Sequence, residues 1–378
     1  MGRETRISSH TPRVFSPTDH AYMARALRLA ERGLYSTTPN PRVGCVIVHR
    51  GEIVGEGYHE RSGEPHAETR ALDRASERAR AATVYVTLEP CSHHGRTPPC
   101  ADALLEAGVS RVVAAMRDPN PLVAGQGLQR LRAAGIAVET GLCEEQAREL
   151  NVGFVARMTR QRPWLRVKTA ASLDGRTALA NGQSQWITGE AARRDGHRWR
   201  ARSCAVMVGI GTLLADNPRL TVREIKTPRQ PLRIVIDRRL DIPLDAHVLE
   251  GGNVLIATAH GEHDKVRRLE ELGARVLPLP NAEGKVDLGA LMRELARREL
   301  NEVLVESGSR LSGALIRAGV VDELIVYLAP QLLGDTARGM FDLGELTALG
   351  ERIELTIRDV RRIDADLRVI ARLTRFDG

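Results

Sequence analysis

Short apolar runs rich in valine alternate with amphipathic, helix-like stretches along almost the whole chain. The runs at 43–48, 83–88 and 111–116 are of this kind, and helical patterns at 66–80 and 101–107 separate them. Apolar strands joined by helices are typical of sheets that helices cover on both faces. The alternation therefore predicts an α/β protein and argues against an all-helical or an all-β fold.

A second α/β series begins after residue 160. The chain has 378 residues, which at about 150 residues per domain is more than one domain usually holds. Apolar content lapses at 158–163, and the strand pattern at 164–169 opens a new series that runs to 366–373. We therefore expect three parts: a polar lead at 1–18, a first domain at 19–160 and a second domain at 161–378.

Composition argues against several classes of protein. Aromatic residues make up only 3% of the chain, and the net charge of +7 is spread along it without a polybasic run. Neither feature suits a nucleic-acid-binding surface. There is no run of about 18 apolar residues, as a membrane span would need. The five cysteines are too few and odd in number for a disulfide framework, so we expect a cytoplasmic protein that acts on a small molecule.

The strongest local signal is the pair of His66-Ala67-Glu68 with Pro90-Cys91 and a later Cys100. One imidazole and two thiolates can hold a zinc ion and leave its fourth position to water. Glu68 lies two residues after His66 and can transfer protons without ligating the metal. Taken singly, each residue could be structural, but together they match the signature of zinc-dependent nucleobase deaminases.

The spacing of the two cysteines departs from the general deaminase motif. Residues 92–99 separate them, whereas the usual motif has only two intervening residues. The longer segment contains Arg96, which suits a substrate that carries a phosphate. His93 and His94 lie next to each other there, and we expect them to contact substrate or shape the loop rather than to bind zinc.

Five stretches together resemble one family of enzymes. They read PNPRVGCVIV at 39–48, GEIVGEGYH at 51–59, GEPHAE at 63–68, VTLEPCSHHGRTPPC at 86–100 and KTAASLDGRTA at 168–178. They closely resemble the bifunctional deaminase-reductases of riboflavin biosynthesis, whose pattern includes the long cysteine spacing. The resemblance implies a cytidine-deaminase-like three-layer α/β/α domain followed by a dihydrofolate-reductase-like α/β domain.

The resemblance also implies two chemical steps on one substrate. The first is the hydrolytic, zinc-dependent deamination of 2,5-diamino-6-ribosylamino-4(3H)-pyrimidinone 5′-phosphate. The second is the NADPH-dependent reduction of its ribosyl group, which gives 5-amino-6-ribitylaminouracil 5′-phosphate. Such a chain is expected to form a homo-oligomer, either a dimer or a tetramer.

In the deaminase half, the resemblance assigns His66, Cys91 and Cys100 to zinc and Glu68 to proton transfer. It places substrate contacts at Asn40, His59 and Arg96. For each of these last three residues, a turn-forming or solvated role is the alternative.

In the reductase half, we expect catalytic roles for Lys168, Asp216 and Glu306. A lysine at 168 is informative because the chain has only four lysines among its 55 basic residues; a solvent-facing cation is the alternative. The resemblance implies NADPH contacts at Ala170, Ser184, Trp186, Thr212 and Asp216, and we expect a further one at Gly308. It implies substrate contacts at Arg200, Leu220 and Arg223, and we expect a further one at Glu306.

Three of these expectations rest on the residues themselves. Trp186 can either cover a nicotinamide or fill the core. Gly308 belongs to a turn of small residues that opens a helix, where backbone N–H groups can hold a pyrophosphate. Arg238 follows a strand of the second domain, and we expect it to meet the 2′-phosphate of NADPH.

The main alternative is a zinc deaminase of another nucleobase or of nucleic acid, with a non-catalytic C-terminal binding domain. The scarce aromatic residues, the dispersed charge and the long segment between the cysteines argue against it. An enzyme with one working half is disfavoured by the presence of both sets of site residues. A structural zinc protein would leave Glu68 unexplained.

Overall fold

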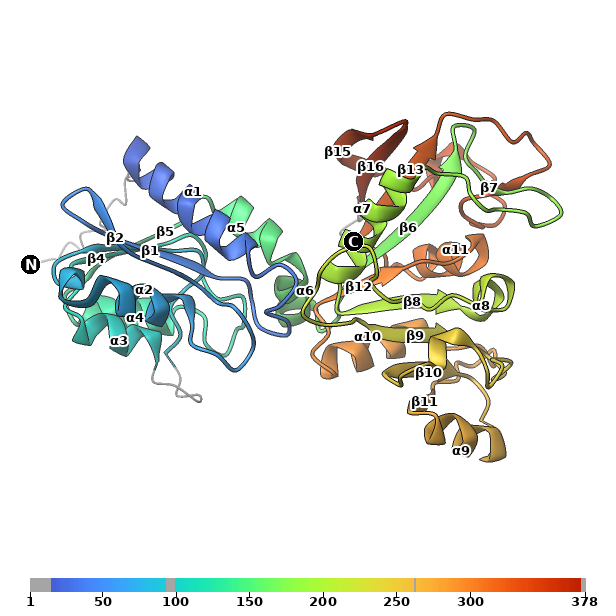
Figure 1. Cartoon of the computed structure of the whole chain (residues 1–378), viewed down its shortest axis with the longest axis horizontal. Coiled ribbons are helices and arrows are strands. Elements are labelled where there is room, and N and C mark those ends of the chain that lie inside the picture. Colours follow the sequence, from blue (N-terminus) through green and yellow to red (C-terminus); the bar gives the residue numbers. More distant parts are fainter. Residues whose placement is uncertain (1–14, 93–98, 262, 375–378) are drawn as a thin grey trace, which may run out of the picture. The chain divides into compact units, whose positions relative to one another are not determined.

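The computed structural model describes residues 15–92, 99–261 and 263–374, which form two compact units (Figure 1). The first unit contains the chain up to Gly33 together with Arg42–Asn151. The second unit contains Leu34–Pro41 and the chain from Val152 onward. No helix within the described residues is both long and apolar enough to cross a membrane.

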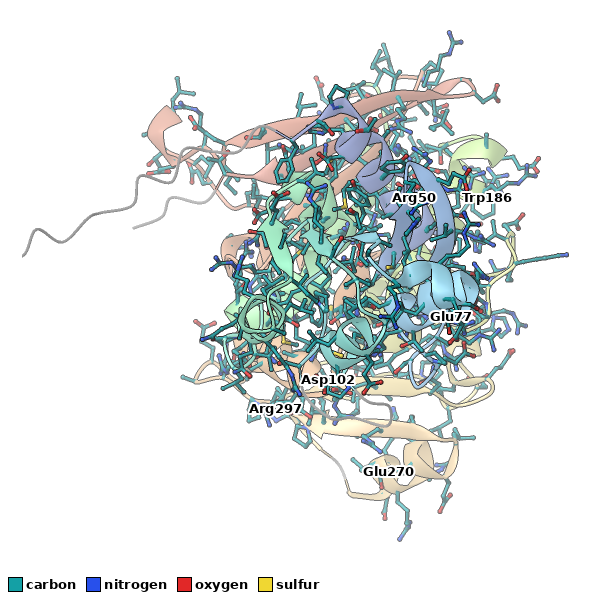
Figure 2. All side chains as sticks on the ribbon, turned by 90° about the vertical axis from the view of Figure 1, so that its left-hand side faces the viewer. Arg50, Glu77, Asp102, Trp186, Glu270 and Arg297 are labelled. Carbon is teal, nitrogen blue, oxygen red and sulfur yellow. The ribbon has the colours of Figure 1, made fainter. Side chains whose placement is uncertain are left out.

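The first unit contains a five-stranded sheet in the order β2-β1-β3-β4-β5. Its strands are β1 (Gly44–His49), β2 (Glu52–Tyr58), β3 (Thr83–Val86), β4 (Arg111–Ala114) and β5 (Ala137–Thr140). Strand β1 is antiparallel to β2 and β3, while β3, β4 and β5 are parallel. Arg50 and Gly51 join β1 to β2 with positive φ angles of 52° and 83°, the combination that a two-residue hairpin turn favours. Arg50 projects into solvent at this turn (Figure 2).

Helices cover both faces of this sheet (Figure 1). They are α1 (Pro17–Glu31), α2 (Ala67–Ala75), α3 (Cys100–Glu106), α4 (Gln126–Ala133) and α5 (Glu144–Leu150). A Cβ on Gly44 would lie 2.0 Å from the carbonyl oxygen of Ala26, and one on Gly57 would lie 2.3 Å from that of Ala67. Glycine at these two positions therefore lets α1 and α2 pack directly on the strands, which completes a three-layer α/β/α arrangement.

Helix α1 begins earlier than the sequence suggests. Its N-cap is Ser16, inside the expected polar lead, and the side chains of Ser16 and Asp19 form a reciprocal capping box. Asp19 also accepts hydrogen bonds from Tyr85 on β3 and Arg111 on β4, at 2.7 and 2.6 Å. This carboxylate therefore fastens α1 to the sheet.

The second unit contains a nine-stranded sheet in the order β11-β10-β9-β8-β12-β6-β13-β16-β15. The strands are β6 (Trp164–Ser172), β8 (Ala205–Gly209), β9 (Leu232–Ile236), β10 (Val254–Thr258), β11 (Ala274–Pro278), β12 (Glu302–Val305), β13 (Glu323–Ala329), β15 (Leu355–Ile363) and β16 (Asp366–Leu373). Neighbours from β11 to β13 are parallel, whereas β16 and β15 are added antiparallel. A short ribbon pairs β7 (Arg176–Ala178) with β14 (Arg338–Gly339).

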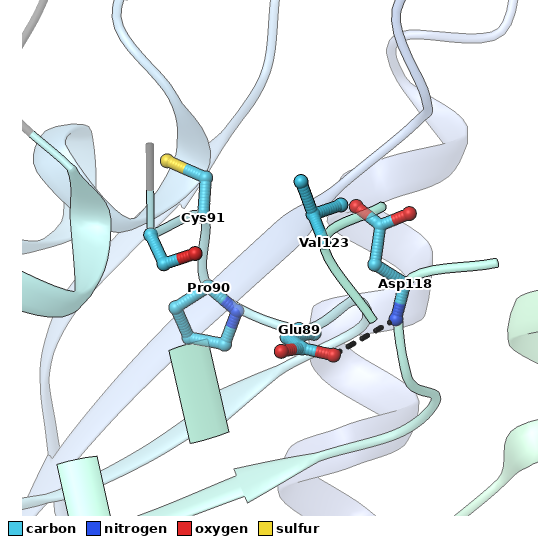
Figure 3. A pocket seen from close by; sticks show the side chains of 6 residues that line it. Glu89, Pro90, Cys91, Asp118 and Val123 are labelled. Carbon is cyan, nitrogen blue, oxygen red and sulfur yellow. Dashed lines mark hydrogen bonds between the residues drawn. The ribbon is translucent and has the colours of Figure 1, made fainter. Parts of the chain in front are cut away.

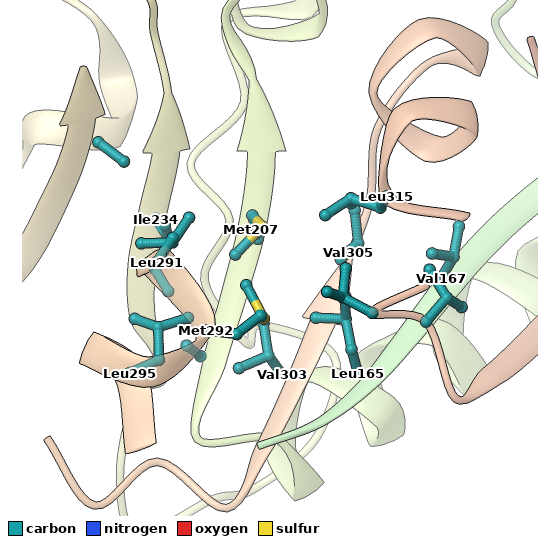
Figure 4. Close-up of a cluster of buried hydrophobic side chains, with 14 of the residues drawn as sticks. Leu165, Val167, Met207, Ile234, Leu291, Met292, Leu295, Val303, Val305 and Leu315 are labelled. Atoms are coloured by element: carbon teal, nitrogen blue, oxygen red, sulfur yellow. The ribbon is translucent and has the colours of Figure 1, made fainter. Parts of the chain in front are cut away.

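The helices of this unit are α6 (Val152–Arg160), α7 (Glu190–Arg202), α8 (Ile210–Asp216), α9 (His263–Glu271), α10 (Leu288–Arg297) and α11 (Ser309–Arg317). Buried side chains of α10 and α11, such as Leu291 and Leu315, pack with Met207, Val303 and Val305 of the sheet (Figure 4). Parallel strands bring their carboxyl ends to one edge of a sheet, where α/β proteins bind ligands. The segments after β8 and β12 lie at this edge.

A buried charge cluster lies where β6, β12 and β13 run side by side. Arg166 is only 1% exposed and donates hydrogen bonds to Glu302 and Glu323. Arg202 and Arg372 supply further partners for these two carboxylates. The charges thus neutralise one another within the sheet.

Replacing Arg166 with alanine should destabilise the second unit by about 3–5 kcal/mol, because it leaves two buried carboxylates short of their partner. Thermal or urea unfolding would measure the loss. Arg194→Ala removes an exposed pair with Glu190 and should cost less than about 1 kcal/mol. Equal stabilities for the two variants would contradict a structural role for the buried cluster.

Candidate active sites

His66, Cys91 and Cys100 form a compact cluster in the first unit, with all three candidate ligand atoms within 4.8 Å of one another. His66 Nδ1 lies 3.3 Å from Cys100 Sγ and 3.6 Å from Cys91 Sγ. Tetrahedral zinc with Zn–N near 2.1 Å and Zn–S near 2.3 Å would separate nitrogen and sulfur ligands by about 3.6 Å. The donor set and its spacing therefore fit zinc.

The two thiols differ in acidity. Hydrogen bonding with Cys100 lowers the pKa of Cys91 to about 4 although burial opposes it, and His66 adds to this effect. The same contact raises the pKa of Cys100. The pair thus retains one proton, which binding of a divalent cation would displace.

Glu68 lies in the first turn of α2 and is only 3% exposed. Burial raises its pKa to about 7; His66 opposes this shift, and the charge of Cys91 adds to it. A carboxyl group of this acidity can take up and release a proton near neutral pH.

The structure describes two of the three residues that we expect to contact the deaminase substrate. His59 is buried, and its ring meets that of His66 edge to face with centroids 5.4 Å apart. Asn40 lies on the Leu34–Pro41 segment of the second unit. Arg96, like His93 and His94, lies outside the described residues.

Glu89 is a residue that the sequence analysis missed. Its buried carboxylate accepts hydrogen bonds from the backbone N–H groups of Asp118, Gly125 and Gly127, with N···O distances of 3.1, 2.9 and 3.0 Å. It thereby holds the loop after β4 against the segment that carries Cys91. A small hollow lies between them (Figure 3), lined by Glu89, Pro90, Cys91, Ser92, Asp118 and Val123. The sequence did contain a signal for this role, because Glu89 is an acidic residue within the otherwise apolar stretch VTLEPC.

In the second unit, Lys168, Arg200 and Glu306 come together from β6, α7 and the segment after β12. Arg200 donates from Nε and Nη2 to the two carboxylate oxygens of Glu306, at 2.7 and 2.8 Å. Burial alone would raise the pKa of Glu306, but Arg200 and then Lys168 outweigh it and hold the pKa at about 2. Glu306 is therefore a carboxylate at all ordinary pH values.

Strand β6 continues to Ser172 rather than ending at 169, so Lys168 lies inside the strand. There it is paired with Ile325 of β13. Burial lowers the pKa of its ammonium group; Glu306 opposes this effect and Arg200 adds to it. Its Nζ lies 5.6 Å from the centre of the Tyr327 ring. These surroundings do not match a solvent-facing cation.

Several expected cofactor contacts lie near one another. The backbone N–H of Gly308, just before α11, donates to Thr212 Oγ1 of α8 at 3.0 Å. Asp216 ends α8 and hydrogen-bonds with Gln185, the neighbour of Trp186. Trp186 is 70% exposed (Figure 2), so it does not fill the core. Ser184 is half-buried in the same loop.

The other expected contacts have different surroundings. Ala170 lies on β6 opposite Tyr327. Leu220 is 2% exposed and packs in the core around β8, β9 and β10, so its side chain is not open to a ligand. Arg238 is exposed after β9 and donates from Nε to the carbonyl oxygen of Gly284.

Arg223 is exposed, and its backbone N–H donates to Nδ1 of His197. The sequence analysis missed His197. The signal was its position three residues before Arg200 on α7, which places both side chains on one helix face.

Comparison with known proteins relates both units to one family. A family model described as the RibD C-terminal domain matches residues 163–369, and one described as the cytidine and deoxycytidylate deaminase zinc-binding region matches residues 16–116. The riboflavin biosynthesis protein RibD of Escherichia coli is 50% identical over 362 residues, which cover 92% of this chain and 98% of that protein. RibD of Aquifex aeolicus is 42% identical over 351 residues, which cover 92% and 97%.

Solved structures agree with these sequence matches. Acinetobacter baumannii RibD superposes with a TM-score of 0.89 at 45% identity, covering 95% of this chain and 99% of that one. A diaminohydroxyphosphoribosylaminopyrimidine deaminase/5-amino-6-(5-phosphoribosylamino)uracil reductase from Thermotoga maritima superposes with a TM-score of 0.83 at 34% identity, covering 94% and 99%. The expected order of a deaminase domain before a reductase domain is thus confirmed. Because the matches span both units, the chain belongs to the RibD family of bifunctional deaminase-reductases in riboflavin biosynthesis.

Proposed function

We propose that the chain performs two consecutive steps on one pyrimidine ribotide. The first is the hydrolytic deamination of 2,5-diamino-6-ribosylamino-4(3H)-pyrimidinone 5′-phosphate, and the second is the NADPH-dependent reduction of its ribosyl group to ribityl. One observation carries this assignment: the same chain holds a zinc-type donor set beside a buried glutamate and a separate cluster of Lys168 with Glu306. We assign deamination to residues 19–160 and reduction to residues 161–378.

In the deaminase half, His66, Cys91 and Cys100 would hold zinc, whose chemistry there is to activate water for attack on an amino-bearing ring carbon. Glu68 accepts the proton of the attacking water and delivers it to the amino group, which leaves as ammonia. His59 contacts the substrate beside this centre, and we assign further contacts to Asn40 and Arg96.

In the reductase half, NADPH would supply a hydride to the ribosyl carbon of an open-chain substrate. Lys168 delivers the accompanying proton, since burial has made its ammonium group more acidic. Glu306 keeps Lys168 in place and accepts hydrogen bonds from substrate hydroxyls, while Arg200 fixes the orientation of Glu306.

The remaining assignments concern NADPH and the other substrate contacts of the reductase half. We assign Gly308, Thr212, Ala170, Ser184, Trp186 and Asp216 to NADPH, and we also assign Asp216 a catalytic part. We assign Leu220 and Arg223 to the substrate. The contact between Gly308 and Thr212 supports a shared role for these two residues.

We further propose that the protein is a cytoplasmic homo-oligomer, a dimer or a tetramer. Strand β15 at the edge of the large sheet exposes Leu355, Ile357 and Val360, and exposed apolar edge strands tend to pair. The five cysteines are too few and odd in number for a disulfide framework, which favours a reducing compartment.

The most direct test is incubation of the zinc-loaded protein with the diamino substrate. Ammonia should be released without NADPH, and NADPH should be oxidised only after deamination has produced the reducible pyrimidine. Ammonia release from cytidine or single-stranded DNA in place of this substrate would favour the alternative deaminase.

Glu68→Gln should keep zinc bound and reduce deamination at least about 100-fold, because the amide cannot transfer protons. Ammonia release and zinc content would be measured, together with reduction of pre-deaminated substrate, which should stay normal. Glu77→Gln changes an exposed glutamate of the same unit (Figure 2) and is the matched control. Loss of both activities in a folded Glu68→Gln protein would contradict separate sites.

Lys168→Ala should have the reverse effect, with NADPH oxidation lowered at least about 100-fold and deamination unchanged. Absorbance of NADPH would follow the reaction. Lys285→Ala removes an exposed lysine and should leave both rates unaltered. Normal NADPH oxidation in Lys168→Ala would remove Lys168 from the catalytic residues.

Arg238→Ala should weaken NADPH binding about 10-fold or more and leave NADH binding unchanged, since a hydrogen-bonded charge pair with the 2′-phosphate would be lost. Titration of protein fluorescence with each nucleotide would measure both affinities without turnover. An unaltered preference for NADPH would show that Arg238 does not meet this phosphate.

A further inference from the structure

His197 lies in the reductase site without an assigned role. It is on α7, three residues before Arg200, and is only 7% exposed. Next to it, a Cβ on Gly196 would lie 4.0 Å from Lys168 Cε. His197 itself interacts electrostatically with Glu306, so its ring lies near the residues to which we assign the reduction.

One hydrogen bond determines which ring nitrogen of His197 carries the proton. The backbone N–H of Arg223 donates to Nδ1 over 3.2 Å, so Nδ1 must present a lone pair. The proton of the neutral ring is then on Nε2. Nε2 makes no hydrogen bond to any residue of the described ranges 15–92, 99–261 and 263–374. An N–H donor of a buried ring is thus left available to a ligand.

The surroundings keep this ring neutral. Burial lowers the pKa of His197 to about 4, with Arg200 and Arg223 acting in the same direction and Glu306 and Glu224 opposing them. At neutral pH the ring therefore donates from Nε2 without adding a positive charge next to Lys168.

The arginines near this ring differ in their freedom to bind a phosphate. Arg200 donates from Nε and Nη2 to Glu306 and from Nη1 to the carbonyl oxygen of Thr221. Most of its hydrogen-bonding capacity is thus used within the protein. Arg223 has an exposed side chain, and its backbone is held by His197. The guanidinium of Arg223 and Nε2–H of His197 are donors that remain open to an anion.

We propose that His197 binds the 5′-phosphate of the reductase substrate by donating a hydrogen bond from Nε2 to a phosphate oxygen. Its Nδ1 holds the chain at Arg223, so that one imidazole both contacts the anion and positions the arginine that shares it. This inference rests on the proposed function, because the phosphorylated pyrimidine is the ligand that the site is assigned to bind. Hydrogen bonds to charged acceptors are stronger than neutral ones, so loss of this donor should be measurable.

The test compares His197→Ala and His197→Gln in the full chain. Reduction is followed with the deaminated substrate and with the same compound lacking its 5′-phosphate. His197→Ala should raise KM for the phosphorylated compound about 10- to 100-fold and change kcat little, and KM for the dephosphorylated compound should stay the same. His197→Gln should restore KM, because the amide can accept from the Arg223 N–H and donate through its nitrogen. His20→Ala, an exposed histidine of the first unit, is the matched control.

Two results would overturn the proposal. One is an equal rise of KM for both compounds, and the other is a fall in melting temperature or NADPH affinity that His197→Gln does not correct. Calorimetry with ribose 5-phosphate tests the same contact without turnover: weaker binding by His197→Ala supports it, and equal binding to wild type contradicts it. Failure of the wild-type protein to oxidise NADPH would instead count against the proposed reduction, while the calorimetry still decides on His197.

Discussion

The ion pair between Arg200 and Glu306 is the interaction on which the reductase site depends. Glu306 follows the central strand β12, and Arg200 lies on α7, so the pair connects the carboxyl edge of the sheet to the helix that covers it. Both side chains are mostly buried, and a charge in such surroundings that loses its partner is strongly destabilised. Together with the ion pairs of Asp195 and Arg202, this pair holds α7 against the sheet and so fixes the surroundings of Lys168 and His197.

The two units use a buried glutamate in opposite ways. Glu68 faces thiols and an imidazole, and burial raises its pKa to about 7. Glu306 faces Arg200 and Lys168, and its pKa is held at about 2 although burial opposes this. One carboxyl group can therefore exchange protons during a reaction, while the other stays charged and orients its neighbours. The neighbours, and not the residue type, decide which role each plays.

The sequence predicted the metal centre better than the reductase site, because the metal ligands lie in short motifs whose local geometry is repeated from protein to protein. His66 opens a helix and Cys91 follows a strand and a proline, so the motif already predicts that their side chains meet at one metal centre. Glu89 and His197 act through backbone N–H groups of segments more than twenty residues away, and no local pattern reports such contacts. For the same reason the sequence could not predict the burial of Leu220 or the ion pair of Arg200 with Glu306, since both depend on how β8, β9 and α7 pack.

The basic residues of this chain also differ in what they can do chemically. Arginine stays protonated at any ordinary pH, whereas a lysine can lose its proton when burial makes its charged form unfavourable. The structure has arginine where a permanent charge is needed, at Arg166 between two glutamates and at Arg200 beside Glu306. It has lysine at 168, where the assigned reaction requires a proton to leave. In a chain with four lysines among 55 basic residues, a lysine at this half-buried position is best explained by proton transfer, since an arginine there would provide the charge but could not release its proton.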